Sequence, residues 1–105
     1  MHLATFTWQD GVTAEQVEEV SSALSNLPGH IPQIRGYHYG PDLGLRAGNA
    51  DYGVCALVDT EDDVSAYLDN PEHLRVVQQV IAPIRAQRLA VQVRVPDGFT
   101  LAAPG

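Results

Sequence analysis

The sequence contains no lysine, and its six basic residues are all arginines. Without a lysine amine the chain cannot form a Schiff base, which excludes covalently held pyridoxal phosphate. Thirteen acidic residues give a formal net charge of −7. Nucleic acids and anionic membranes are both bound through basic surfaces, so we expect neither as a partner.

The sequence is also poor in cysteine and has no long apolar run. Cys55 is the only cysteine, so no internal disulfide can form. No apolar stretch reaches the length that spans a membrane. The segment 1–6 lacks the basic start and long apolar centre of a signal peptide. Together these features predict a cytoplasmic protein.

The chain has 105 residues, of which 45% are hydrophobic, and this suffices for one folded domain. We expect that domain to span residues 1–96. The segment 97–105 is short and carries glycine and proline, so we expect it to be a loose C-terminal tail.

Apolar periodicity predicts the order β-α-β-β-α-β, which is the ferredoxin-like α+β plan. Thr13 and Gln16 fit a capping box at the start of the first helix. The second helix begins after Thr60 and restarts at Asn70. Its predicted apolar stripe consists of Leu74, Val77, Ile81 and Ile84. The predicted strands are residues 2–8, 33–39, 51–58 and 86–95.

The third predicted strand is apolar on both faces, with Tyr52 and Val54 on one and Cys55 and Leu57 on the other. Two helices cover only one face of a four-stranded sheet, so the other face would be left exposed in a monomer. We therefore predict a homodimer in which the sheets pack against each other.

The segment from Tyr67 to His73 carries the strongest functional signal. Asn70 suits a helix cap and Pro71 suits the first helical position, which places His73 in the first turn. The positive end of the helix dipole disfavours the imidazolium there. His73 is thus a candidate general base, and Tyr67 could bring a phenol to the same pocket. The structural alternative is a capped helix that happens to carry a histidine.

The order and spacing of several short motifs resemble the stress-responsive A/B barrel (Dabb) family of dimeric α+β barrels, over about residues 2–95. The loop Asp42-Leu43-Gly44-Leu45 is most similar to the actinobacterial branch. The other matching motifs are His2-Leu3, Asp10-Gly11-Val12-Thr13, Leu27-Pro28, Ile31-Pro32, Gly40, Asn49-Ala50-Asp51-Tyr52, and Tyr67 through His73.

This resemblance implies a function. One plant member, olivetolic acid cyclase, closes a linear polyketide by aldol condensation, and its catalytic tyrosine and histidine match Tyr67 and His73. By that resemblance the chain would be a cofactor-independent polyketide cyclase or lyase-type enzyme. It would bind a small apolar carbonyl compound in a pocket between sheet and helices. The candidate substrate-binding residues are His2, Phe6, Trp8, Leu24 and Val54.

The chain departs from the family pattern at several positions. Asn70 stands where the family commonly has histidine. By comparison with the cyclase, Val54 takes the place of a pocket histidine on the third strand, and Ser21 and Leu24 take the places of aromatic residues on the first helix. These differences favour the alternative of a non-catalytic stress-response or ligand-binding dimer. A cofactor-free monooxygenase is a further alternative, by analogy of fold alone.

We expect no metal and no cofactor. His2 and His73 lack a paired carboxylate and make a poor ligand set. Arg46, in the loop of residues 40–50, could either meet an anionic substrate or bond across the dimer.

Overall fold

A computed structural model describes residues 1–101 of the chain. It contains four strands and three α-helices, with a 3₁₀ turn after the first helix and a π-helical segment after the third. In chain order the elements are β1 (His2–Trp8), α1 (Ala14–Ser25), η1 (Leu27–Gly29), β2 (Gly36–Pro41), β3 (Tyr52–Leu57), α2 (Glu61–Leu68), α3 (Pro71–Val76), η2 (Val77–Ile81) and β4 (Arg85–Gln92).

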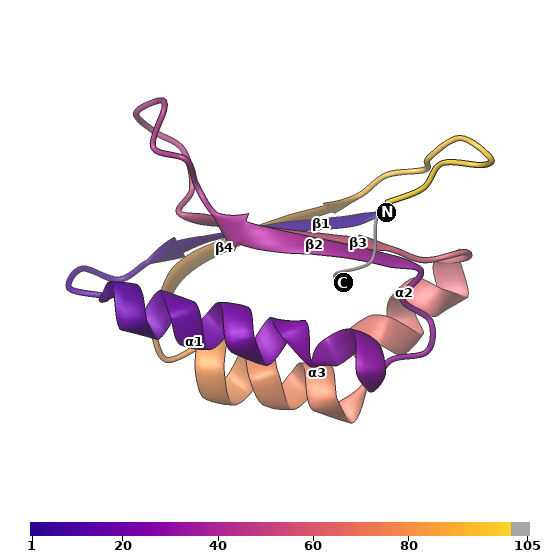
Figure 1. Cartoon of the computed structure of the whole chain (residues 1–105), viewed down its shortest axis with the longest axis horizontal. Coiled ribbons are helices and arrows are strands. Elements are labelled where there is room, and N and C mark those ends of the chain that lie inside the picture. Colours follow the sequence, from indigo (N-terminus) through magenta and orange to yellow (C-terminus); the bar gives the residue numbers. More distant parts are fainter. Residues whose placement is uncertain (102–105) are drawn as a thin grey trace.

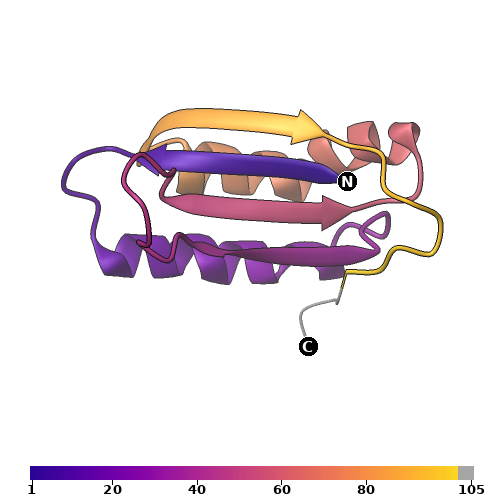
Figure 2. The same ribbon diagram turned by 90° about the horizontal axis from the view of Figure 1, so that it is seen from above.

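The strands form one antiparallel sheet in the order β2-β3-β1-β4 (Figure 2). All helices lie on the same face of this sheet, and the other face is uncovered (Figure 1). The predicted ferredoxin-like α+β fold is therefore confirmed.

Alternation along the strands sends one set of side chains toward the helices. Ala4 on β1 lies opposite Val54 on β3 and Ala90 on β4, so these residues share the inner face. Val20 and Leu24 of α1 pack against that face. The predicted capping box is present: Gln16 N–H donates to Thr13 Oγ1, and Thr13 N–H donates to Gln16 Oε1.

The predicted apolar stripe of the last helix is wrong at one position. Leu74 is 41% exposed, whereas Val76 is fully buried and joins Ile81 and Ile84 in the core. The helix becomes π-helical over Val77–Ile81, which shifts the buried face relative to a regular period.

Two strand boundaries differ from expectation by three residues, and the remaining ones by two or fewer. β2 starts at Gly36 because Ile34 N–H closes a turn by donating to the carbonyl of Ile31. β4 ends at Gln92, although Val93 N–H still donates to the carbonyl of Met1.

The outer face of the sheet is apolar over β4 and β3. Leu89 is 62% exposed and Val91 is 53% exposed, while Cys55 is half-buried. His38 is exposed on this same face, opposite to Tyr37 and Tyr39, because successive side chains along a strand alternate between its faces.

Beyond β4 the chain crosses the end of the sheet and returns to β2 (Figure 2). There the backbone of Leu101 lies so close to Gly36 that a Cβ at position 36 would sit 2.3 Å from the Leu101 carbonyl oxygen. The remainder of the tail, residues 102–105, lies outside the described residues. Within the described residues no helix has the length and apolar character needed to cross a membrane.

Candidate active site

A small cavity of about 30 Å³ lies between the inner face of the sheet and the helices. That volume is roughly the space one water molecule occupies in the liquid. The structure gathers six of the seven predicted site residues around it: His2, Phe6, Leu24, Val54, Tyr67 and His73.

The seventh, Trp8, does not line this cavity. Its ring stacks on Phe6 at 5.7 Å and also contacts Tyr52 at 5.7 Å between centroids. The sheet register shifts between Thr7 and Trp8, so Trp8 lies at the irregular end of β1, beyond the cavity. In this protomer Arg46 also lies away from the cavity, exposed in the loop between β2 and β3.

The orientation of His73 follows from the break between α2 and α3. In a continuous helix the Leu68 carbonyl would accept from the N–H of residue 72. Here Glu72 N–H donates to Asn70 Oδ1 at 2.9 Å, and Pro71 has no N–H to offer. His73 Nδ1 lies 3.0 Å from the Leu68 oxygen and is the donor to it. The bond therefore fixes the Nδ1–H tautomer and leaves Nε2 with its lone pair.

Burial is the main reason that the pKa of His73 lies below its ordinary value, and the charge of Arg88 acts in the same direction. The hydrogen bond to Leu68 and the charge of Asp69 oppose this shift. The helix dipole was expected to lower the pKa of His73, but desolvation by burial is the larger cause of the lowering. His73 is thus a neutral base near pH 7.

Tyr67 is the immediate neighbour of His73 in the cavity, with ring centroids 4.7 Å apart. The side chain is 1% exposed, and burial raises the pKa of its phenol. Tyr67 consequently keeps its proton and can donate a hydrogen bond to an oxygen in the cavity.

His2 forms the opposite wall, 5.7 Å from the Tyr67 ring. Gln92 Nε2 donates to His2 Nδ1 at 2.7 Å, which places the His2 proton on Nε2. Burial, followed by the charge of Arg88, lowers the pKa of His2 to about 4. His2 is therefore a neutral hydrogen-bond donor rather than a cation.

Tyr37 was missed by the sequence reasoning. It lines the cavity, is 1% exposed, and its ring lies 6.4 Å from that of Tyr67. Its buried hydroxyl makes no well-formed hydrogen bond among residues 1–101, and the group that acts on its pKa by hydrogen bonding is the Tyr67 hydroxyl. A ligand oxygen in this cavity could accept from both phenols. The tyrosine-rich strand at 33–39 was the only signal in the sequence.

Val54 and Leu24 contribute hydrocarbon to the walls of the cavity. Ser21 Oγ instead bonds the Tyr52 hydroxyl at 2.7 Å. No group of three or more potential metal ligands lies together in the described part of the chain.

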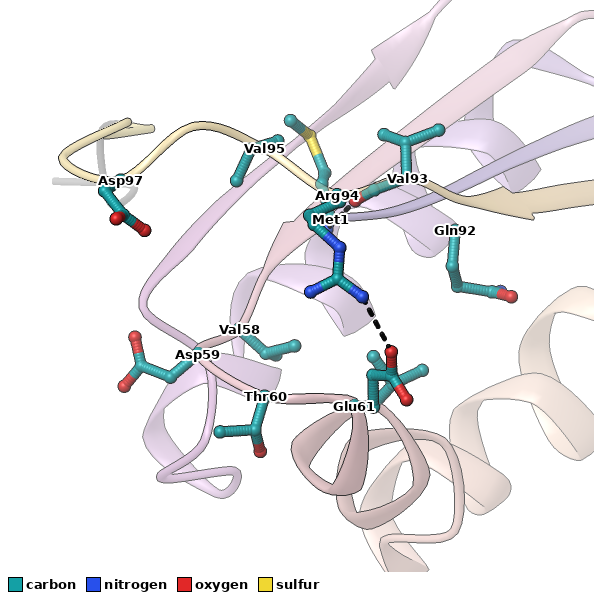
Figure 3. A pocket seen from close by; sticks show the side chains of 11 residues that line it. Met1, Val58, Asp59, Thr60, Glu61, Gln92, Val93, Arg94, Val95 and Asp97 are labelled. Carbon is teal, nitrogen blue, oxygen red and sulfur yellow. Dashed lines mark hydrogen bonds and ion pairs between the residues drawn. The ribbon is translucent and has the colours of Figure 1, made fainter.

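A larger open cleft of about 530 Å³ lies at the other end of the sheet, where β4, the start of α2 and the tail meet (Figure 3). Glu61 and Arg94 form an ion pair at 3.0 Å there, and both side chains are more than four-fifths exposed. Its lining residues include no histidine, tyrosine or cysteine. We therefore place the candidate site in the smaller cavity.

Comparison with known proteins agrees with this architecture. The model of the Stress responsive A/B Barrel Domain, Dabb, matches residues 1–95. The chain belongs to the Dabb family. A curated Dabb relative, the stress-response A/B barrel domain-containing protein HS1 of Arabidopsis thaliana, is 24% identical over 75 residues, covering 70% of this chain and 69% of HS1.

Two solved structures with a similar fold differ widely in their sequence identity to this Dabb chain. A dimeric ferredoxin-like protein of unknown function from Thermobifida fusca is 49% identical, with a TM-score of 0.83 over 90% of this chain and 88% of that one. A hydroxynitrile lyase from Passiflora edulis is 16% identical, with a TM-score of 0.78 over 93% and 94%. The second shares the fold alone.

Proposed function

We propose that this Dabb protein is a cofactor-independent enzyme of the cyclase or lyase type, acting on a small apolar carbonyl compound. The observation that carries the proposal is the hydrogen bond from His73 Nδ1 to the Leu68 carbonyl. This bond leaves Nε2 as the basic nitrogen, inside an apolar cavity and beside the phenol of Tyr67.

The proposed chemistry begins with removal of a proton α to the carbonyl. His73 Nε2 takes that proton, and the electron pair of the C–H bond moves to the carbonyl oxygen as an enolate. The Tyr67 hydroxyl stabilises the enolate oxygen by donating a hydrogen bond, which is strong in a cavity that excludes water. In a cyclisation the enolate carbon attacks a second carbonyl of the substrate, and the imidazolium gives its proton to the alkoxide oxygen that forms. In an elimination the carbonyl re-forms, a double bond forms between the α- and β-carbons, and the leaving group departs from the β-carbon with its bonding pair and takes the proton from the imidazolium.

Two further observations support this reading. The fold is shared with a protein named as a hydroxynitrile lyase, so its architecture is compatible with lyase chemistry. The neutral His2 and the buried hydroxyl of Tyr37 add donors on the walls facing Tyr67.

One observation favours a second candidate function, a non-catalytic ligand-binding dimer. The cavity of about 30 Å³ is much smaller than typical ligand pockets, so a substrate must move part of its wall. Val54 also offers no polar group, whereas the resemblance to the cyclase implies a histidine at this position. In this second case the ligand would be bound and released unchanged.

Exchange of α-protons distinguishes the two candidates without knowledge of the natural substrate. Incubation with slowly exchanging methyl ketones such as acetophenone or methyl levulinate in D₂O, followed by ¹H NMR, should show deuterium incorporation faster than in protein-free buffer. The rate should fall in acid as His73 becomes protonated. Binding without any enhanced exchange would favour the non-catalytic dimer.

We also propose that the protein is a homodimer formed through the outer face of the sheet. Leu89, Val91 and Val93 are all more than two-fifths exposed there, whereas inner-face residues of the central strands such as Ala4 and Val54 are buried. The protein from Thermobifida fusca, at 49% identity, is described as dimeric. A second copy of this chain would cover the same side chains.

Placing a charge in this face should separate the protomers. Val91→Asp would bury a carboxylate against the partner sheet, so it should convert a dimer to a monomer in sedimentation velocity. Leu74→Asp is the matched control, since Leu74 is 41% exposed on the helical side and should leave the dimer intact. A Val91→Asp protein that still sediments as a dimer would contradict this interface.

A further inference from the structure

The register of β4 brings two arginines to the same side of the sheet. Arg88 lies opposite Phe6, and Arg85 lies opposite Trp8, although only two residues separate the arginines. In a regular strand, residues three apart point to opposite faces. Here the strand pairing shifts by one residue between Thr7 and Trp8. Arg85 and Arg88 therefore lie on the same face of the sheet, toward the helices. Bulges of this kind re-aim side chains beside functional sites.

Both arginines line the cavity that holds His73 and Tyr67. Arg88 is exposed and Arg85 half-buried, so the pair lies where the cavity meets solvent. The cavity has no aspartate or glutamate in its lining. Within residues 1–101 the arginines that form ion pairs are Arg35, Arg75 and Arg94, and neither Arg85 nor Arg88 is among them.

The charge of Arg88 also affects the cavity. After burial, it helps to lower the pKa of His2 and of His73, and it partly opposes the rise that burial causes in the pKa of Tyr67. In a chain of net charge −7, the lining of this cavity thus carries two guanidinium groups and no carboxylate, and Asp69, whose charge acts on His73, lies outside the lining. A guanidinium pair at the mouth of an apolar cavity suits an anionic group that remains near solvent while the rest of the ligand enters.

We propose that Arg85 and Arg88 bind a carboxylate of the ligand, so that the substrate class is a small keto acid. This inference rests on the proposed function, because it assigns the ligand of the same site. The carboxylate accepts hydrogen bonds from the two guanidinium groups, and the carbonyl end extends toward Tyr67 and His73. The long, exposed side chain of Arg88 is the part of the wall that moves aside on entry.

The experiment compares levulinate, a stable keto acid, with its neutral methyl ester. Exchange of α-protons in D₂O and binding by NMR titration are measured for both compounds. The parent protein should bind levulinate at least roughly tenfold more tightly, as is typical of charge-assisted hydrogen bonds. Arg88→Gln should remove most of that preference, Arg85→Gln should reduce it, and neither should weaken binding of the ester more than about twofold.

Arg46→Gln is the matched control, because it makes the same change in net charge from an exposed loop outside the cavity. An equal loss of levulinate binding in Arg46→Gln would overturn the assignment, as would an Arg88→Gln protein that keeps the full preference. Tighter binding of inorganic phosphate than of levulinate would overturn the choice of a carboxylate. Exchange of the ester without preference for the acid refutes only this inference, whereas exchange of neither compound refutes the proposed function.

Discussion

Replacement of His73 by glutamine should slow α-proton exchange from a bound methyl ketone by about 10²–10⁴-fold, the usual contribution of a general base. Glutamine retains an N–H that can donate to Leu68 but has no nitrogen that accepts a proton near pH 7. The measurement is the exchange rate by ¹H NMR in D₂O, with circular dichroism to show that the fold is kept.

His30→Gln is the control for this result, because His30 is exposed in a loop and outside the cavity. It should leave the exchange rate unchanged. Tyr67→Phe should slow exchange by about 10²-fold through loss of the donor to the enolate. If His73→Gln exchanged protons as fast as the parent protein, His73 would not be the base.

Acidification should destabilise the fold through His2. Burial lowers the pKa of His2 from its ordinary value of 6.5 to about 4 in the folded protein, so between these pH values the unfolded chain binds the proton and the folded chain does not. The stabilisation by neutral His2 is complete above pH 6.5 and is lost as the pH falls to about 4. A shift of this size corresponds to about 3 kcal/mol of unfolding free energy.

Urea unfolding at fixed protein concentration, between pH 7 and pH 4, measures this effect. The variant His2→Gln should show a shallower loss of stability, because it has no imidazole to titrate, while His30→Gln should follow the parent curve. His73, whose pKa is also lowered, adds to the loss in the same direction. Equal slopes for the parent and His2→Gln would show that His2 does not resist protonation in the fold.

The part of the site that could be predicted from the sequence depends on short-range rules. Alternation along β1 places His2 and Phe6 on the buried face, and the Asn70-Pro71 cap places His73 in a first turn. These rules require only neighbouring residues, so they carried over into the structure. The break between α2 and α3 also leaves the carbonyl of Leu68 free to accept from His73. This hydrogen bond was not predicted, because it depends on how the two helices are placed relative to each other.

The remaining parts depend on irregular backbone. The parity of Arg85 is reversed by a register shift that arises from pairing with β1, which no pattern within residues 86–95 reveals. The π-helical segment similarly buries Val76 in place of Leu74. Tyr37 was expected in a strand, but the burial of its hydroxyl follows from three-dimensional packing.

The contact between Gly36 and Leu101 has a consequence for defining a minimal fragment of this protein. The family match ends at residue 95, yet the chain continues across the sheet until Leu101 rests on the first residue of β2. A fragment cut at the family boundary would leave a gap at that corner of the sheet. Any side chain at position 36 would push the returning segment away, since even a methyl group would overlap the Leu101 backbone. Truncation experiments on this domain should therefore retain the chain through residue 101.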